Sequence, residues 1–335
     1  MKTQFRLFAL FLLLATLLTS CGGPSLASTE PEATKTEEAA TKETKPAPVE
    51  IKKEQPDPTA DRYLNVLVIG NSFSTGWPDE LNGLFTAAGI KVNIFTVYYS
   101  GCPVSAHWNW LKSGQKHYRL RHHEQDGGIS DDDPVNLEYC LKKKNWDVIS
   151  LQQHFGPNIA VDYDKALKSC EPFVKDLYDY IKENYPKSKL VWHQTWAYEV
   201  GWKRDDQSVP DLACQTLCHE NIRAVSIKMA QDNGVALIPS GDAFAIARAN
   251  GSGDLSRDGY HDGKITGGQY LNACTWFESL TGMSCLDNSF RPKYKNEQTG
   301  EIEAISEERI KLLQNAAHEA VANNTLKPEI QLPQH

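Results

Sequence analysis

Three polar residues have the types and spacing of a nucleophilic catalytic group. Ser72 lies in the stretch NVLVIGNSFSTGWPDEL, directly after a run of aliphatic residues. Asp258 and His261 lie three positions apart in the glycine-rich stretch RDGYHDGK. A serine nucleophile needs a base that takes its proton, and the base needs an acid that fixes its tautomer and stabilises the imidazolium. One loop with Asp258 and His261 could provide both the base and the acid for Ser72.

Each of these features also has a purely structural interpretation. Ser72 or Ser74 could cap the helix that follows, because serine is among the most favourable N-cap residues. Asp258 could likewise be a cap residue beside a histidine on the surface. The occurrence of both features in one chain favours the catalytic interpretation.

Two further positions could donate hydrogen bonds to the oxygen of a reacting carbonyl group. Gly101 follows a predicted strand in YYSGCP, where its backbone N–H could point into the crevice without a side chain in the way. Gln152 ends another predicted strand in VISLQQHF, and its amide is a donor. Together with the backbone N–H of Ser72, these groups predict an oxyanion hole of three donors. Gln153 is the alternative to Gln152.

The expected elements bring these residues to one edge of a sheet. Short apolar runs alternate with helical stretches, which predicts βαβ units and a parallel sheet covered on both faces. We therefore expect an α/β fold, a flavodoxin-like three-layer α/β/α sandwich with a five-stranded parallel sheet. An inserted polar loop region, about 105–145, separates strands two and three. The strands are expected near 66–69, 92–99, 146–153, 189–196 and 235–241, and the helices near 77–88, 162–184, 211–233, 266–280 and 307–322.

The motifs at the strand ends resemble those of the SGNH hydrolases, also called the GDSL esterase/lipase superfamily. The stretches IGNSFS, GCPVSAHW, WDVISLQQ, HQTWA and DGYHDGKITGGQYLNACTWFESLTG resemble more closely a branch of bacterial secreted proteins and lipoproteins that is known mainly as a domain of unknown function. The resemblance covers about residues 64–282. Gly-Asn-Ser replaces the usual Gly-Asp-Ser, and Leu-Gln-Gln replaces the usual Gly-x-Asn-Asp after strand three.

The resemblance implies a role for each candidate residue. Ser72 would be the nucleophile, His261 the general base and Asp258 its orienting acid. The backbone N–H groups of Ser72 and Gly101 would bind the oxyanion. Neither a metal nor an organic cofactor is required by this mechanism.

Aromatic and histidine residues near the expected crevice suggest the kind of substrate. We expect the insertion to overhang the crevice, where Trp108 and Trp196 could stack on sugar rings, with His107 as a hydrogen-bonding partner. His154 is expected to line the crevice. These residues favour a carbohydrate O-acyl esterase, with acetyl as the expected acyl group and a polysaccharide or oligosaccharide ester as substrate. A carbohydrate O-acyltransferase, a glycan-binding lipoprotein without activity, and a packing role for the aromatic residues remain as alternatives.

The N-terminus has the pattern of a bacterial lipoprotein. Residues 1–20 combine a charged start with a short apolar run, which predicts a signal peptide. Leu18-Thr19-Ser20-Cys21 resembles a lipobox, so Cys21 is expected to be lipidated and to anchor the protein to the bacterial cell membrane, outside the cytoplasm. Residues 21–60 have the composition of a disordered tether. Residues 61–335 are expected to form the hydrolase domain, with a helical extension at its C-terminal end.

Composition restricts the partners and the chemistry further. The formal net charge of -8 and the absence of a long basic stripe argue against nucleic acid as a partner. The acidic and histidine run near 122–133 lacks the spacing of a calcium loop or a zinc site, so it predicts no metal site. We expect a monomer. In an exported protein some of the seven cysteines other than Cys21 are expected to pair.

Overall fold

The structure is a computed structural model that describes residues 62–125, 127–296 and 299–333. The predicted signal peptide, Cys21 and the tether lie outside the described residues.

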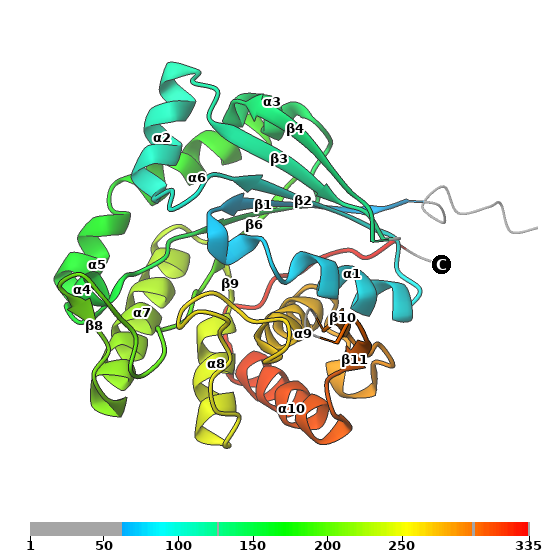
Figure 1. The fold of residues 1–335 in the computed structure, drawn as a ribbon. Coiled ribbons are helices and arrows are strands. Elements are labelled where there is room, and N and C mark those ends of the chain that lie inside the picture. Colours follow the sequence, from blue (N-terminus) through cyan, green and yellow to red (C-terminus); the bar gives the residue numbers. More distant parts are fainter. Residues whose placement is uncertain (1–61, 126, 297–298, 334–335) are drawn as a thin grey trace, which may run out of the picture. The chain divides into compact units, whose positions relative to one another are not determined.

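A seven-stranded sheet in the order β4-β3-β2-β1-β5-β6-β9 forms the centre of the described region (Figure 1). Five of its strands are parallel: β1 (Leu64–Gly70), β2 (Val92–Tyr98), β5 (Val148–Gln152), β6 (Lys189–His193) and β9 (Ala236–Ile238). When these five strands are numbered along the chain, their order in the sheet is 2-1-3-4-5, which is the flavodoxin-like order. The predicted fold class is therefore confirmed.

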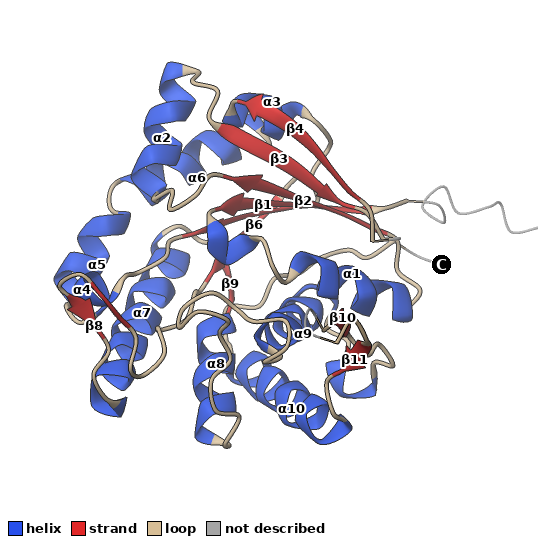
Figure 2. Cartoon of the chain, viewed as in Figure 1, coloured by secondary structure: helices blue, strands red, loops and turns tan. Residues whose placement is uncertain are grey.

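Helices cover both faces of this sheet (Figure 2). Val66 and Val68 of β1 enter one apolar core, whereas the alternating residues Leu67 and Ile69 enter the other. Because both faces of β1 are buried, its sequence is a continuous apolar run rather than an alternating one. The helices of the first core are α1 (Pro78–Ala87), α8 (Ser240–Ala249), α9 (Gly268–Thr281) and α10 (Glu307–Asn323). Those of the second include α5 (Tyr163–Cys170), α6 (Phe173–Asn184) and α7 (Leu212–Asp232).

The insertion between strands two and three has regular structure, which differs from the predicted loop region. It contains α2 (Val104–Ser113), β3 (Tyr118–His123), β4 (Ile129–Val135) and α3 (Leu137–Lys142). Strand β3 pairs antiparallel with β2, and β4 pairs with β3. The hairpin therefore widens the sheet at its edge instead of overhanging the crevice.

Alternation of side chains explains this hairpin. Tyr118 and Leu120 of β3 are buried, whereas Arg119 and Arg121 between and beyond them are partly exposed. Arg121 forms an ion pair with Asp131 on β4. The charged residues that suggested a polar loop are thus the outer face of a half-buried strand pair.

Two helices differ from the sequence prediction. The stretch predicted as one helix over 162–184 is broken into α5 and α6 at Pro172, because proline clashes with the preceding turn and has no N–H to donate. Helix α8 was not predicted. The shorter elements are η1 (Ser72–Ser74), α4 (Pro157–Ala160), β7 (Lys203–Arg204), β8 (Gln207–Ser208), η2 (Cys285–Asp287), β10 (Lys293–Lys295) and β11 (Ile302–Ala304).

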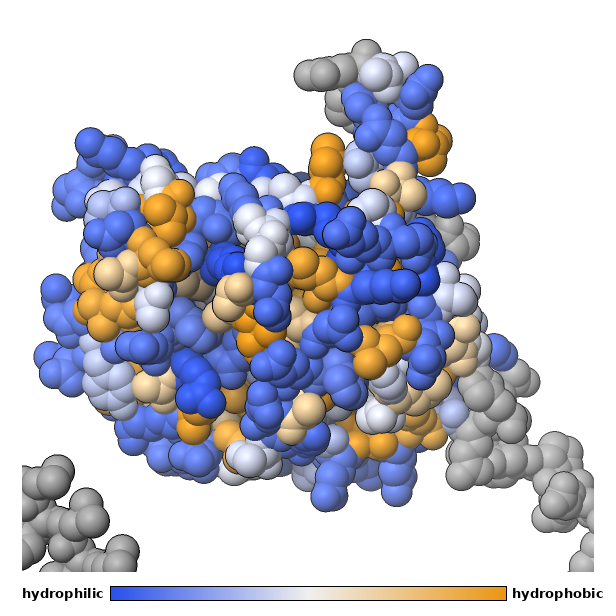
Figure 3. All heavy atoms as spheres, turned by 90° about the horizontal axis from the view of Figure 1, so that it is seen from below, coloured by the Kyte–Doolittle hydropathy of each residue, from blue (hydrophilic) through white to orange (hydrophobic). Residues whose placement is uncertain are grey.

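The face of the described region that carries α8 and α10 is largely polar. Apolar side chains form small groups on it (Figure 3). No helix among the described residues is long and apolar enough to span a membrane. The seven cysteines of this region are free thiols in the structure, all but Cys214 buried, so the expected pairing is not observed.

Candidate active site

The nucleophile candidate lies where β1 ends. Asn71 follows the strand in an extended conformation, and its Oδ1 accepts a hydrogen bond from the backbone N–H of Phe73 at 3.1 Å. This contact closes the short η1 turn that carries Ser72 in a half-buried position. Helix α1 has Trp77 at its N-cap position and no side-chain cap. The alternative prediction, Ser72 or Ser74 as the cap of this helix, is therefore wrong.

Asp258 and His261 form a close hydrogen-bonded pair. Asp258 Oδ2 lies 2.7 Å from His261 Nδ1, and the backbone N–H of His261 donates to Asp258 Oδ1 at 2.9 Å. Burial alone would raise the pKa of Asp258, but the two hydrogen bonds from His261 lower it below its usual value. An ionised Asp258 accepts a hydrogen bond from Nδ1–H and so keeps the proton on Nδ1, which leaves a lone pair on Nε2. This is the tautomer that a general base requires.

Burial also keeps His261 neutral. It lowers the pKa of His261 below the ordinary value of 6.5, against the opposing effect of Asp258. Nε2 is buried and has no hydrogen-bond partner among the described residues. Near neutral pH the ring thus has an unoccupied acceptor nitrogen.

Phe73 links the serine to this histidine. Its ring centroid lies 5.7 Å from that of His261, and Phe73 follows Ser72 directly in the chain. No hydrogen bond joins Ser72 Oγ to His261 Nε2 in the structure. Catalytic hydrogen bonds are often long in an unliganded enzyme and shorten when substrate binds.

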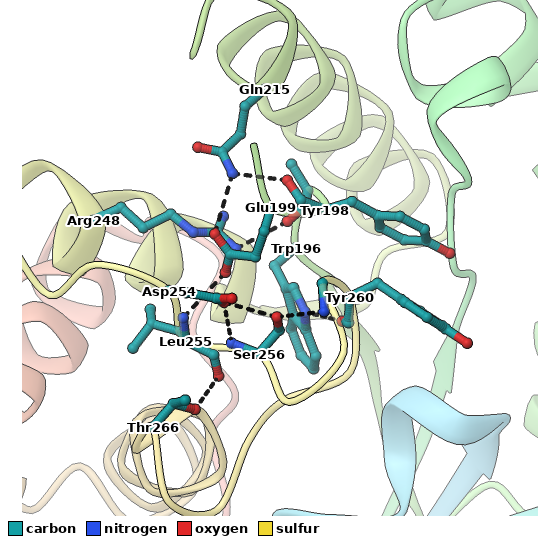
Figure 4. A network of polar contacts seen from close by, with 12 residues as sticks. Trp196, Tyr198, Glu199, Gln215, Arg248, Asp254, Leu255, Ser256, Tyr260 and Thr266 are labelled. Atoms are coloured by element: carbon teal, nitrogen blue, oxygen red, sulfur yellow. Dashed lines mark hydrogen bonds and ion pairs between the residues drawn. The ribbon is translucent and has the colours of Figure 1, made fainter. Parts of the chain in front are cut away.

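A polar network supports the loop that carries Asp258 and His261 (Figure 4). Trp196 Nε1 donates to the carbonyl oxygen of Tyr260 at 2.7 Å, and the Glu199 backbone N–H donates to that of Gly259 at 2.8 Å. The Glu199 carboxylate accepts hydrogen bonds from Arg248 of α8 at 2.6 Å and from the Leu255 N–H at 3.2 Å. The loop is therefore fixed to the end of β6 and to α8.

Two of the predicted oxyanion donors remain available in the structure. The backbone N–H groups of Ser72 and Gly101 have no hydrogen-bond partner among the described residues. Gly101 has a φ of +62°, a conformation that glycine adopts without strain. Both groups follow the carboxyl ends of neighbouring strands.

The structure contradicts Gln152 as the third donor. Its side chain is fully buried, and its Nε2 donates to Asn71 Oδ1 at 2.8 Å. A Cβ atom at Gly70 would lie 2.5 Å from Gln152 Nε2, so the amide packs beneath the end of β1. The alternative, Gln153, is also buried, and its Oε1 accepts a hydrogen bond from the Val104 N–H at the start of α2. Neither amide faces a substrate.

Two of the four predicted substrate contacts are wrong. His107 is fully buried against Tyr118 of β3, with its Nδ1 2.9 Å from the tyrosine hydroxyl. Trp196 is 1% exposed and stacks on Phe244 at a centroid distance of 4.3 Å. Trp108 is half-buried, with Lys112 Nζ 5.0 Å from its ring centroid, and it forms no aromatic ring pair with another described residue.

The fourth residue, His154, lies at the site. Its ring stacks on Phe73 at a centroid distance of 5.7 Å, on the same side chain that contacts His261. An aromatic group that the sequence analysis missed lies beside it. Tyr198 stacks on Tyr260 at 4.9 Å, and both rings lie within 6.2 Å of the Phe73 ring.

Two hollows of the described region lie away from this site. Two cavities of about 850 and 700 Å³ open at the amino ends of the strands, lined by residues such as Arg62, Asp147 and Lys189. They contain no nucleophile with a paired base. The Asp258–His261 pair lies at the opposite, carboxyl ends of the strands. No group of three or more His, Cys, Asp or Glu residues within the described ranges is arranged to hold a metal ion.

Comparison with known proteins now gives the family. A family described as "Domain of unknown function (DUF4886)" matches residues 65–320. The chain belongs to the DUF4886 family. A crystal structure of a DUF4886 family protein from Bacteroides uniformis ATCC 8492 is 31% identical, with a TM-score of 0.66. The match covers 81% of this chain and 100% of that one.

Other solved structures overlap with this DUF4886 protein only weakly. A lipase/acylhydrolase from Enterococcus faecalis is 16% identical with a TM-score of 0.42, over 65% of this chain and 95% of that one. An acetylxylan esterase from Geobacillus stearothermophilus is 13% identical with a TM-score of 0.41, over 64% of this chain and 92% of that one. Overlaps of this size carry no argument about activity. Among curated proteins, none matches the chain.

Proposed function

We propose that this DUF4886 protein is a serine esterase that hydrolyses O-acyl esters, in particular O-acetyl esters, on a carbohydrate. The observation that carries the proposal is the Asp258–His261 pair, with 2.7 Å between Oδ2 and Nδ1 and an unpartnered Nε2 among the described residues. This pair lies against Phe73, the neighbour of Ser72. Two unpartnered backbone N–H groups at the same strand ends add electrostatic support for an oxyanion.

The proposed reaction proceeds through an acyl-enzyme. Ser72 Oγ attacks the ester carbonyl carbon while His261 Nε2 accepts the hydroxyl proton. The negative oxygen of the tetrahedral intermediate accepts hydrogen bonds from the N–H groups of Ser72 and Gly101. Its collapse breaks the carbon–oxygen bond to the sugar, which leaves as an alcohol with the proton from His261. Water, deprotonated by His261, then attacks the acyl group, and the carboxylic acid and free Ser72 are released.

The aromatic group beside the site supports a carbohydrate as substrate. Trp202 and Tyr260 are half-buried and pack on the buried Tyr198, with centroid distances of 4.8 to 6.0 Å among the three rings. In Figure 4 the rings of Tyr198 and Tyr260 lie side by side and extend away from the polar network. Aromatic faces with polar tips suit the apolar faces and hydroxyl edges of sugars.

The esterase is further proposed to act outside the cytoplasm as a monomer that is tethered to the membrane through a lipid on Cys21. The apolar run and the lipobox-like LTSC of the sequence support this location. Fractionation of cells that express the full chain tests it. The wild type is expected in the membrane fraction, and Cys21→Ala is expected to lose incorporation of labelled fatty acid. Equal lipid incorporation by both proteins would contradict the proposal.

Release of acetate from acetylated polysaccharides and from p-nitrophenyl acetate tests the activity. Ser72→Ala is expected to lower kcat by on the order of 10⁴ or more. Ser74→Ala is the matched control, because Ser74 lies in the same turn and its buried Oγ has no hydrogen-bond partner within the described region. Glycan binding without turnover by the wild type would favour the binding lipoprotein. Transfer of the acyl group to an added sugar, faster than to water, would favour the acyltransferase.

A further inference from the structure

The side-chain amide of Asn71 has a defined orientation. The backbone N–H of Phe73 donates to one end at 3.1 Å, and the carbonyl oxygen of Cys102 lies 3.0 Å from the other. A backbone N–H can only donate and a carbonyl can only accept, so the first end is Oδ1 and the second is Nδ2. The Gln152 amide donates to the same Oδ1 at 2.8 Å. Asn71 is thus fixed from three sides.

This orientation determines the tautomer of His154. His154 Nδ1 lies 3.0 Å from Asn71 Nδ2, which carries two hydrogens and no lone pair for an acceptor role. One hydrogen points to Cys102, and the other is donated to His154 Nδ1, which must therefore be unprotonated. Burial, with a smaller contribution from the nearby His261, lowers the pKa of His154 to about 4. The ring is neutral near pH 7 and carries its proton on Nε2.

His154 lies beside the nucleophile. Asn71 precedes Ser72 and binds the His154 ring, while Phe73 follows Ser72 and stacks on the same ring with an interplanar angle of 23°. The only hydrogen-bond contact of the His154 ring among the described residues is the one at Nδ1, so Nε2 has no partner there, and the residue is half-buried. The site therefore contains a histidine with an unoccupied acceptor, His261, and a second with an unoccupied donor, His154.

We propose that the Nε2–H of His154 is the third oxyanion donor, in the role that Gln152 cannot fill. This inference rests on the proposed esterase function. A neutral imidazole donates a hydrogen bond to a developing oxyanion without giving up its proton, so it can polarise a carbonyl through the whole reaction. Asn71 and Gln152 act as positioning residues, because they set the tautomer and the orientation of His154.

Steady-state kinetics of the full chain on p-nitrophenyl acetate test the role. His154→Ala is expected to lower kcat by about 10² to 10³ with little change in KM, which is the effect of losing one oxyanion donor. His154→Gln places an amide N–H near the position of Nε2 and is expected to recover part of this loss. Circular dichroism checks that each variant folds. If His154→Ala does not fold, His154→Gln still provides the test. An unchanged kcat, or a raised KM alone, in His154→Ala would overturn the inference and leave the esterase in place.

The tautomer of His154 can be measured without an activity assay. Long-range ¹H–¹⁵N correlation spectra of the ¹⁵N-histidine-labelled chain are expected to show an unprotonated Nδ1 and a protonated Nε2 for His154, assigned by loss of the signal in His154→Gln. A protonated Nδ1 would overturn the inference even in an active enzyme. A wild type that is inactive and insensitive to Ser72→Ala would instead overturn the proposed function, and the donor role with it.

Discussion

At the scale of single residues, the proposed chemistry depends on which ring nitrogen carries the proton in His261 and in His154. Asp258 keeps the His261 proton on Nδ1 and so leaves Nε2 as an acceptor. Ser72, Asp258, His261 and Gly101 can be selected as candidates from the sequence because each follows a strand or lies in a short loop with a recognisable pattern. Gln152 is also selected, since strand alternation does not show that its amide donates to Asn71. Nothing in the sequence pattern indicates a role for Asn71.

Replacement of Asp258 by asparagine tests the tautomer at the base. The amide of the asparagine side chain in Asp258→Asn would donate to His261 Nδ1, shift the proton to Nε2 and remove the acceptor for Ser72. We expect kcat to fall by on the order of 10⁴ with the fold intact. Asp254→Asn serves as the control, because it retains the Oδ1 acceptor for Ser256 in the same loop. A loss of tenfold or less in Asp258→Asn would be inconsistent with this role.

The pH dependence of kcat/KM tests the state of His261. Only the neutral ring accepts the Ser72 proton, so the rate must fall as the pH falls through the pKa of His261. Because burial lowers this pKa from 6.5, the acid limb is expected below pH 6.5, and the rate stays on its plateau at pH 7. A profile measured between pH 4 and 9 checks this. An acid midpoint above pH 6.5 would contradict the assignment.

At the scale of elements, the errors of the sequence analysis have shared causes. The position of Trp196 after a strand predicts a substrate contact, but Trp196 packs on Phe244 of α8, a helix that the sequence analysis does not predict. The predicted loop region of the insertion places His107 at the substrate, but its partner Tyr118 begins β3. In each case the partner that buries the side chain lies on an element that the sequence analysis does not predict. The five parallel strands were predictable because each is a buried apolar run.

The contact from Trp196 to the loop that carries Asp258 and His261 gives a prediction at this scale. Trp196→Phe keeps an aromatic ring against Phe244 but loses the hydrogen bond to the Tyr260 carbonyl oxygen, one residue from His261. We expect the free energy of unfolding to fall by about 1–2 kcal/mol and kcat to fall several-fold. Chemical denaturation and initial rates measure the two effects.

Trp146→Phe is the matched control for this change. Trp146 is also buried, and its Nε1 donates to the Leu141 carbonyl oxygen at 2.9 Å, at the end of α3. A similar loss of stability with an unchanged kcat is expected. Equal losses of kcat in both variants would contradict this prediction, because the loss in Trp196→Phe would then not arise from its hydrogen bond to the loop that carries Asp258 and His261.

At the scale of the whole molecule, the acidic outer strand bears on the proposed monomer. Strand β4 pairs only with β3 among the described strands, and its residues Asp131 and Asp133 are exposed at the edge of the sheet. Charged edge strands discourage pairing with another chain. Asp131→Val with Asp133→Val is therefore expected to cause concentration-dependent association in size-exclusion chromatography with light scattering. Asp164→Val with Asp179→Val, exposed on α5 and α6, changes the charge equally and is expected to remain monomeric.

The most direct test of the serine esterase is covalent labelling of the full chain with a fluorophosphonate, followed by mass spectrometry of its peptides. A fluorophosphonate reacts with a serine that an adjacent base has activated. We expect close to one phosphonyl group per chain, on Ser72, with labelling lost in His261→Ala. No labelling of the folded wild type, or labelling at a serine other than Ser72, would contradict the account.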